Sequence, residues 1–106
     1  MIKPSIESVS LAAAGKLPDH TRVSIADTDA PNGYPISTFT WILLYQEQSY
    51  DGRSIEVAHS LVNMLDWLIH EGQQINETLL YAPIPAGAVQ KAEAILKSVT
   101  FAGKSL

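Results

Sequence analysis

Phe39–Tyr45 is the strongest strand signal along the chain. The segment is rich in aromatic and branched apolar residues, which suit a pleated sheet. Its centre, Trp41–Leu44, does not alternate with polar residues. Because a strand with one wet face alternates, this continuous run predicts a strand that is buried on both faces. Such a strand needs covering layers above and below it and neighbouring strands at its edges.

Two segments before and after this strand repeat apolar residues at helical spacing. Ser5 is a suitable N-cap for a short helix over residues 5–14, and Gly15 suits the position just after its end. Ser54 is a suitable N-cap for a longer helix. One apolar stripe runs along this longer helix through Ala58, Leu61, Val62, Leu65, Leu68 and Ile69. Trp67 lies beside that stripe, so we expect its ring to meet a second surface.

The remaining chain predicts two more helices. Gly72 ends the long helix, and residues 73–80 predict a short further helix. Tyr81–Pro85 cannot be helix interior, because each proline disfavours helix in the residue before it. Pro85 is well placed to begin a last helix. The apolar positions of this last helix are Val89, Ala92, Ile95, Leu96 and Val99. Gly103–Leu106 is predicted to be a tail.

A weaker strand and two polar segments complete the pattern. Thr21–Ala26 alternates polar and apolar residues, which predicts a half-buried strand with Val23 and Ile25 facing inward. Glu47–Gly52 is polar, and we expect it to be exposed. Two strands do not form an independent sheet with both faces covered. We therefore expect an α/β chain in which few strands are flanked by three to four helices and the sheet is incomplete. Such a chain is part of a larger α/β body, or it completes itself by oligomerising.

Composition limits the possible partners. The 106 residues make one domain, 1–106, with 46% hydrophobic residues and a net charge of −4. That charge argues against nucleic acid, which calls for a basic face. The absence of cysteine excludes disulfides, thiolate metal sites and cysteine nucleophiles. No apolar run approaches the ~20 residues that cross a bilayer. Met1–Ser5 is no signal peptide, so we expect a cytosolic chain or the interior or end of a longer exported protein.

The histidines and one acidic loop are the obvious candidates for a metal site. His59 and His70 are eleven residues apart on the long helix, which separates them by ~16 Å along its axis, too far to share a metal. We expect these two and His20 to be surface or helix-end residues, with His70 suited to the negative end of the helix dipole. Asp27–Gly33 has the acidic spacing of a calcium loop. It fails in detail, because its glycine falls one place late and a proline occupies a ligand position, so we predict a connecting loop.

Catalytic and phosphate-loop motifs are missing from the sequence. There is no nucleophile elbow, and Gly103-Lys104-Ser105 lacks the upstream glycine and the following helix of a phosphate loop. Asn76-Glu77-Thr78 fits a glycosylation sequon, a pattern that arises often by chance. Asp66 is interpreted as a partnered structural carboxylate, and Tyr34 and Ser37 as residues that form caps and turn contacts. We assign no catalytic, metal-binding or cofactor-binding residue and predict that the protein is not an enzyme.

Four motifs follow one another in order along the chain. The first is Lys3–Val9 with Ala12–Gly15. The others are Gly33–Ile36 before the apolar strand, Leu65–Gln73 with its Asp-Trp pair, and Tyr81–Pro85 followed by Val89. Together the motifs span nearly all of the sequence, and in this order they resemble the C-terminal third of the periplasmic phosphate-binding protein of bacterial phosphate ABC transporters. The first motif resembles the helix after that family's central domain.

The resemblance implies a two-lobed periplasmic solute-binding protein of type II-like fold that closes over phosphate and delivers it to a membrane permease. In that family the anion ligands belong to parts that precede this segment, so we assign no phosphate-binding residue here. The implied partners are the N-terminal lobe of a phosphate-binding protein and, indirectly, the permease. An alternative is a structural or interaction module that has lost anion binding and self-associates with a second copy of itself.

Two expectations concern the chain in isolation. Its apolar surface exceeds what two strands and three helices cover, so we predict a dimer or higher oligomer. An anion near the helix starts at Ser54 or Ala86 would be held weakly, with no discrimination between phosphate and sulfate. Arg22 and Arg53 show no sign of converging on a common site.

Overall fold

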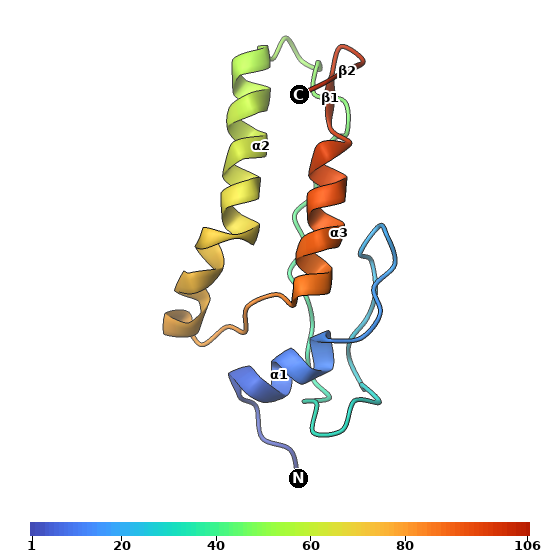
Figure 1. The fold of residues 1–106 in the computed structure, drawn as a ribbon, viewed down its shortest axis with the longest axis vertical. Coiled ribbons are helices and arrows are strands. Elements are labelled where there is room, and N and C mark those ends of the chain that lie inside the picture. Colours follow the sequence, from blue (N-terminus) through green and yellow to red (C-terminus); the bar gives the residue numbers. More distant parts are fainter.

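The computed structural model describes residues 1–106 as four helices and one small sheet (Figure 1). In chain order the elements are α1 (Ile6–Ala13), α2 (Ile55–Ile69), the 3-10 helix η1 (Glu71–Leu79), α3 (Ala86–Lys97), β1 (Thr100–Phe101) and β2 (Lys104–Ser105). Helices α2 and α3 lie side by side along the long axis, and α1 lies across their lower end. The chain is thus a mixed α/β structure with a two-stranded antiparallel sheet.

The first helix confirms the prediction for residues 5–14. The Ser5 hydroxyl accepts a hydrogen bond from the Ser8 backbone N–H at 3.1 Å, and the Ser8 hydroxyl accepts one from the Ser5 N–H at 2.9 Å. This reciprocal pairing satisfies two of the backbone donors that a helix start leaves free. The helix ends at Ala13, Ala14 is its C-cap, and Gly15 follows as predicted.

The long helix and the short helix after it are confirmed as well. The Ser54 hydroxyl accepts from the Val57 N–H at 3.3 Å and caps α2, which ends at Ile69 rather than at Gly72. Residues 71–79 then form the tighter helix η1. Gly72 is buried against Trp67, where an added Cβ would lie 3.1 Å from the indole ring. This glycine is therefore the second surface that the Trp67 ring meets.

The last helix begins one residue later than predicted. Pro85 is its N-cap in extended conformation, so the first helical residue is Ala86. The missing N–H of a proline costs nothing at either position, since the first turn of a helix has no internal acceptor for it. The helix ends at Lys97, whose cation suits the negative end of the dipole.

Neither predicted strand is a strand in the structure. Phe39–Tyr45 is extended, but no other segment pairs with it, and Thr21–Ala26 is irregular. The alternation in Thr21–Ala26 is still visible in the burial of its side chains, because Val23 and Ile25 are half-buried whereas the residues next to them are exposed. A strand is defined by its hydrogen-bonded neighbour. Neither segment has such a neighbour in this structure.

The predicted C-terminal tail is instead a hairpin. Thr100 pairs with Ser105 and Phe101 with Lys104 across a two-residue loop. The loop residues Ala102 and Gly103 both have positive φ, 51° and 76°. This is the geometry of the turn that best fits hairpin twist, for which Asn-Gly is the preferred sequence. Ala-Gly is a weak form of that signal, which explains why the sequence did not reveal the hairpin.

Replacing Ala102 by asparagine is expected to stabilise the protein. Alanine is disfavoured at positive φ, whereas asparagine adopts that conformation with much less strain. We expect Ala102→Asn to raise the free energy of unfolding by about 1 kcal/mol, measured as a higher urea midpoint. Ala102→Val, whose branched side chain is worse at positive φ, serves as the opposite control and should lower the midpoint. A lower midpoint for the asparagine variant would contradict this account of the loop.

Glu47 and Gln48 fasten this hairpin to the rest of the molecule. The Glu47 carboxylate accepts hydrogen bonds from the Thr100 hydroxyl at 2.8 Å and from the N–H groups of Ala102 and Gly103 at 2.7 and 3.0 Å. It also accepts from the hydroxyl and N–H of Ser49. The Ser49 hydroxyl, followed by the N–H groups of Gly103 and Ser49 and the Thr100 hydroxyl, holds the pKa of Glu47 far below its ordinary value. The expected exposure of Glu47–Gly52 is wrong for Gln48, which is fully buried, with its Nε2 donating to the Tyr45 carbonyl at 2.6 Å.

Candidate interaction surface

The molecule exposes more surface than a self-sufficient domain of its mass. Its accessible surface is 7579 Å². A folded monomer of 11.5 kDa exposes roughly 5,800 Å². The radius of gyration is 15.9 Å, against about 13 Å for a compact chain of this length. The difference in area, of order 1,800 Å², is comparable with the surface that two standard-sized protein interfaces cover on one partner.

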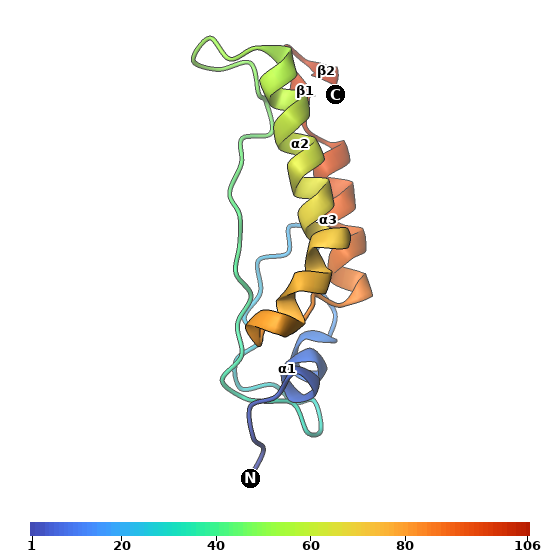
Figure 2. The same ribbon diagram turned by 90° about the vertical axis from the view of Figure 1, so that its left-hand side faces the viewer.

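Five of the large apolar side chains that are exposed belong to the extended segment Ile36–Tyr45. Figure 2 shows that segment running along one side of the helices, from the region of α1 to the C-terminal hairpin. Leu43 is 92% exposed, and the other large apolar side chains that are exposed here belong to Ile36, Trp41, Ile42 and Tyr45. The predicted burial on both faces is therefore wrong for this chain, since only the helical side of the segment is covered. Apolar residues gathered on one exposed segment are typical of a protein interface.

The backbone of the same segment is also unpaired. No backbone N–H from Ile36 to Tyr45 donates a hydrogen bond to any protein acceptor. The Phe39 and Tyr45 carbonyls accept only from side chains, those of Thr38 and Gln48. An extended backbone with free donors and acceptors along both edges is a template for pairing with strands of another chain. The segment therefore offers side-chain and main-chain binding capacity together.

An apolar cavity of about 180 Å³ lies between this segment and the helices. Its lining is almost entirely hydrophobic and includes Phe39, Trp41, Ile42 and Leu44 from the segment. Leu65 and Ile69 of α2 and Ala88, Ala92, Ile95 and Leu96 of α3 line the opposite wall. The segment and the helical layer are thus packed incompletely. Seating a neighbouring strand at the edge of the segment would bring more apolar atoms against this layer, which a well-packed core requires.

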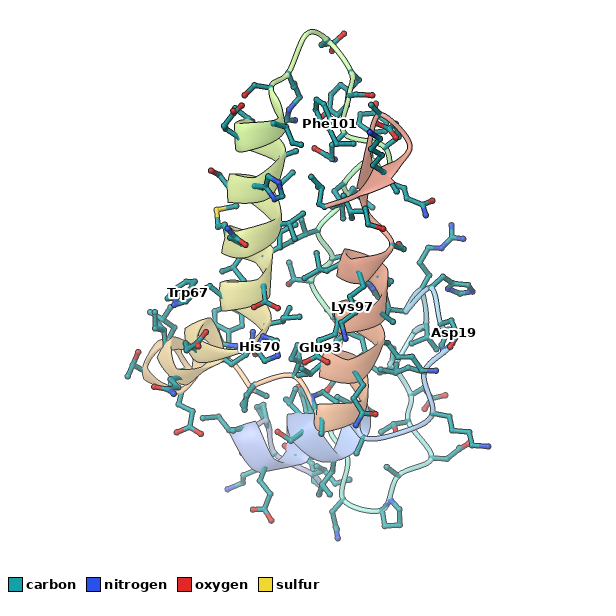
Figure 3. The ribbon with its side chains drawn as sticks, turned by 45° about the horizontal axis from the view of Figure 1, so that its top comes forward. Asp19, Trp67, His70, Glu93, Lys97 and Phe101 are labelled. Atoms are coloured by element: carbon teal, nitrogen blue, oxygen red, sulfur yellow. The ribbon has the colours of Figure 1, made fainter.

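The three histidines occupy different positions and make different contacts. The His20 Nδ1 accepts from the Arg22 N–H at 3.1 Å in an exposed turn, and His59 is exposed on α2. His70 caps the end of α2, and Figure 3 shows its ring directed at Glu93 of α3. No group of three His, Cys, Asp or Glu side chains in the structure has an arrangement that could hold a metal ion. The expectation of surface and helix-end histidines is confirmed.

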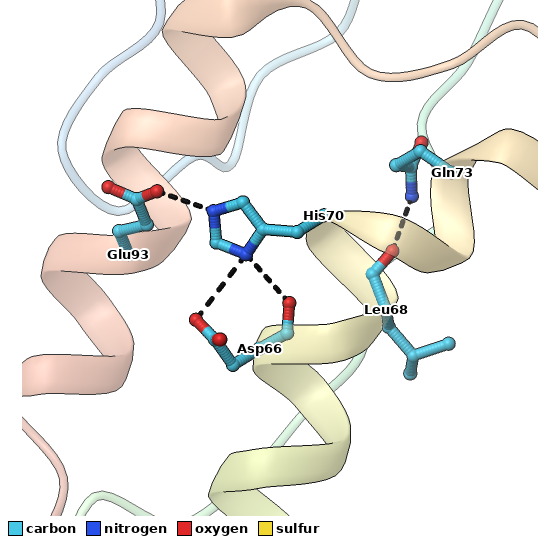
Figure 4. Close-up of polar contacts among 5 residues, drawn as sticks. All are labelled: Asp66, Leu68, His70, Gln73 and Glu93. Atoms are coloured by element: carbon cyan, nitrogen blue, oxygen red, sulfur yellow. Dashed lines mark hydrogen bonds and ion pairs between the residues drawn. The ribbon is translucent and has the colours of Figure 1, made fainter.

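Asp66 has the structural partner that the sequence suggested. Its carboxylate lies 3.4 Å from the His70 ring and its side chain is 60% exposed (Figure 4). Sequence reasoning missed the third member of this group, Glu93 of α3, whose carboxylate is 2.6 Å from His70 Nε2. Glu93 is 23 residues beyond His70, so no local pattern links the two.

Ser37 and Tyr34 form one turn contact and one long-range contact. Ser37 is buried and donates to the Tyr34 carbonyl at 2.7 Å, which confirms the interpretation as a turn contact. The Tyr34 N–H donates at 2.8 Å to the carbonyl of Ser8 in α1, a long-range contact that the sequence did not suggest. Asp27–Gly33 is a connecting loop, closed where the Asp27 N–H donates to the Pro35 carbonyl at 2.7 Å.

The arginines do not converge. Arg22 follows the exposed turn at His20, whereas Arg53 contacts the Tyr50 hydroxyl and lies 5.0 Å from the centre of that ring. Their segments lie at different heights along the long axis in Figure 1. At the helix starts, the Ser54 hydroxyl is engaged with its own helix and Pro85 has no side-chain cap. The donor-rich loop that an anion site requires is not assembled by these residues.

No helix of the structure is both long enough and apolar enough to cross a membrane. No family model matches the chain, and no solved structure matches it.

Proposed function

We propose that this chain is the C-terminal part of the solute-binding component of a phosphate importer and completes a lobe whose remaining strands come from elsewhere. The single observation that carries the proposal is the unpaired apolar segment Ile36–Tyr45, which has free backbone edges and exposed side chains. The four ordered motifs that resemble the phosphate-binding family support the same assignment. The finer fold is then that of a two-lobed periplasmic binding protein of which this chain forms one part.

In this function the chain supplies scaffold rather than anion ligands. Phosphate is held in such proteins by converging donors and by a carboxylate that accepts from a protonated oxygen, which rejects sulfate. Asp66 is engaged with His70, and Arg22 and Arg53 lie apart, so none of them forms such a constellation. The partner is accordingly the N-terminal lobe of a phosphate-binding protein, the location is the periplasm, and the assembled protein delivers phosphate to the permease.

Calorimetric titration tests this proposal. The chain mixed with the N-terminal lobe of a phosphate-binding protein should bind phosphate, and excess sulfate should not compete. The chain alone should bind either anion only weakly, with no discrimination. Micromolar phosphate affinity of the chain alone, unaffected by sulfate, would overturn the assignment of the anion ligands to the other lobe. Absence of heat with every such lobe would overturn the transport function itself.

A matched pair of variants locates the contact. Leu43→Asp places a charge at the centre of the unpaired segment, so it should abolish assembly with the lobe and the phosphate heat with it. Leu80→Asp makes the same change at a residue that is 88% exposed and lies outside the segment, so it should leave both unchanged. Equal effects of the two substitutions would contradict the assignment of the interface.

A self-associating module is the second candidate, favoured by the same exposed segment. Two copies could pair Ile36–Tyr45 edge to edge, because a free strand edge accepts an identical strand. Assembly with the N-terminal lobe separates the two functions. The importer component forms a complex with one chain of each kind, whereas the self-associating module remains a homo-oligomer in the presence of the lobe and binds no phosphate.

A further inference from the structure

His70 has both ring nitrogens directed at hydrogen-bond acceptors (Figure 4). Nδ1 lies 2.8 Å from the Asp66 backbone carbonyl, and Nε2 lies 2.6 Å from the Glu93 carboxylate. A backbone carbonyl only accepts, so Nδ1 must carry a proton. The short distance to the carboxylate then requires a second proton between Nε2 and Glu93. The geometry is that of an imidazolium donating twice, with the strength of a charge-assisted bond.

This ring joins three parts of the molecule. His70 is the C-cap of α2, and its carbonyl accepts from the Gln73 N–H at 3.1 Å at the start of η1. Glu93 belongs to α3, so the ring bridges the α2–η1 junction to the facing helix, as Figure 3 shows. Gln73 stabilises the same α2–η1 junction, because its side chain donates to the Leu68 carbonyl at 2.7 Å and accepts from the Ile84 N–H at 2.9 Å.

The two charged side chains that contact the ring are both acidic. Asp66 faces it from α2 and Glu93 from α3. Glu71 of η1 follows it in the chain, and Lys97 lies one turn beyond Glu93 on α3, but neither forms an ion pair in this group. The ring is also at the negative end of the α2 dipole. The side chains of His70 and Glu93 are 36% and 35% exposed, so the protons between them exchange freely with solvent.

We propose that His70 is a proton-operated latch, which holds the α2–η1 junction against α3 while the ring is doubly protonated and loosens when the ring loses one of its two protons. The neutral ring has a single N–H, so either the Glu93 carboxylate or the Asp66 carbonyl then faces a nitrogen lone pair, and the charge-assisted bond to Glu93 is lost. Ile69 and Ala92, the chain neighbours of the two latch residues, line the apolar cavity under the helical layer. The latch thus fixes how closely that layer packs at one end. This inference does not depend on phosphate transport.

The direction of the pH dependence follows from the pKa of His70. The hydrogen bond to Glu93 raises this pKa most, the Asp66 carbonyl raises it further, and partial desolvation opposes both. A group whose folded pKa is raised contributes stability that is fully present below its unfolded value, near 6.5. That contribution is lost as the pH rises through the higher folded value. The latch therefore holds in mildly acidic solution and releases in alkaline solution.

The test combines a ring titration with unfolding measurements on the full chain. The NMR titration midpoint of the His70 ring should move to lower pH in Glu93→Gln, which keeps the shape of the side chain and removes its charge. Wild-type protein should lose urea midpoint as the pH rises above the ordinary pKa of histidine, near 6.5. His70→Gln should remove that loss. His59→Gln, which deletes an exposed histidine from the same helix, should retain it.

The outcomes are decisive in both directions. A His70 midpoint that Glu93→Gln does not move would show that the contact with α3 does not hold the proton, and would overturn the latch. The same holds if the pH dependence of the urea midpoint is equal in wild type and His70→Gln. A coordinated change in which Glu93→Gln lowers the ring midpoint and flattens the pH dependence of stability would establish it. The ring titration distinguishes this from a merely structural histidine, which would destabilise the fold without moving with Glu93.

Discussion

In the absence of any partner, the chain is expected to form dimers or larger assemblies at micromolar concentration. Its surface exceeds that of a compact monomer by roughly 1,800 Å², as much as two standard-sized interfaces bury on one partner. The unpaired edges of Ile36–Tyr45 supply main-chain hydrogen bonds for the association, and the exposed apolar side chains supply its driving force. Light scattering or sedimentation measures the result directly.

Leu43→Asp is expected to convert these assemblies to monomer. The side chain is 92% exposed in the free chain, so the substitution costs the isolated fold little, whereas in an interface it buries an unpaired charge. Leu80→Asp, made at an equally exposed residue outside the segment, should leave the assemblies intact. A wild-type chain that remains a stable monomer at micromolar concentration would count against the interface.

Gly33→Ala is expected to lower the free energy of unfolding by about 2 kcal/mol, in the range of overpacked core substitutions. An added Cβ would lie 2.7 Å from Thr28 Cγ2, 3.2 Å from the Ala30 carbonyl oxygen and 3.3 Å from Ala12 Cα. Two of these atoms are backbone and cannot move cheaply. Rotating the Thr28 side chain would break the hydrogen bond in which its hydroxyl accepts from the Ala30 N–H at 3.1 Å. The clash therefore separates α1 from the loop that holds it.

Gly15→Ala is the matched control. This glycine follows the same helix, has no atom within 4 Å of an added Cβ, and does not have positive φ. Its substitution should change stability by no more than about 0.5 kcal/mol, or raise it slightly by restricting the unfolded chain. Urea unfolding compares the two variants. Similar midpoints for both would show that the close approach at Gly33 is not needed for the fold.

The helices were predictable from the sequence because their determinants are local. Ser5 and Ser54 cap the helices that they precede, and proline positions separate η1 from α3. Spacing of apolar residues within a single segment is enough to indicate each helix. The boundaries differ by one to three residues, which is where capping geometry rather than pattern decides.

Strands were harder because their determinants are not local. Phe39–Tyr45 has the composition of a buried strand, yet burial and pairing depend on neighbours that this chain does not contain. The hairpin at residues 100–105 was missed for the opposite reason, since its strands are two residues each and its loop carries alanine where asparagine is preferred. Composition indicates which secondary structure a segment favours, and the rest of the protein decides whether the segment pairs with another strand.

The polar groups show the same division. The Ser37 contact with Tyr34 spans three residues and was foreseen as a turn contact. The contact of Glu93 with His70 was not foreseen, because the two residues are 23 apart, nor were the contacts of Glu47 with the hairpin, whose residues lie 53 or more positions away. The local sequence around a carboxylate on an exposed helix face or in a polar turn does not indicate which distant donor it contacts. Both acidic residues acquire their roles from the packing of α2 against α3 and of the hairpin against the turn before α2.

The hydrogen bonds between Glu47 and the hairpin also set an order of events during synthesis of the chain. Thr100 leaves the ribosome 53 residues after Glu47, a delay of about 3 to 10 s at typical elongation rates of ~5–20 residues per second. Throughout that interval the apolar segment and the growing α2 have no C-terminal closure. The nascent chain is then open to association through Ile36–Tyr45, the surface with the least protection. Any strand that is present during this interval gains those seconds to bind before the hairpin docks.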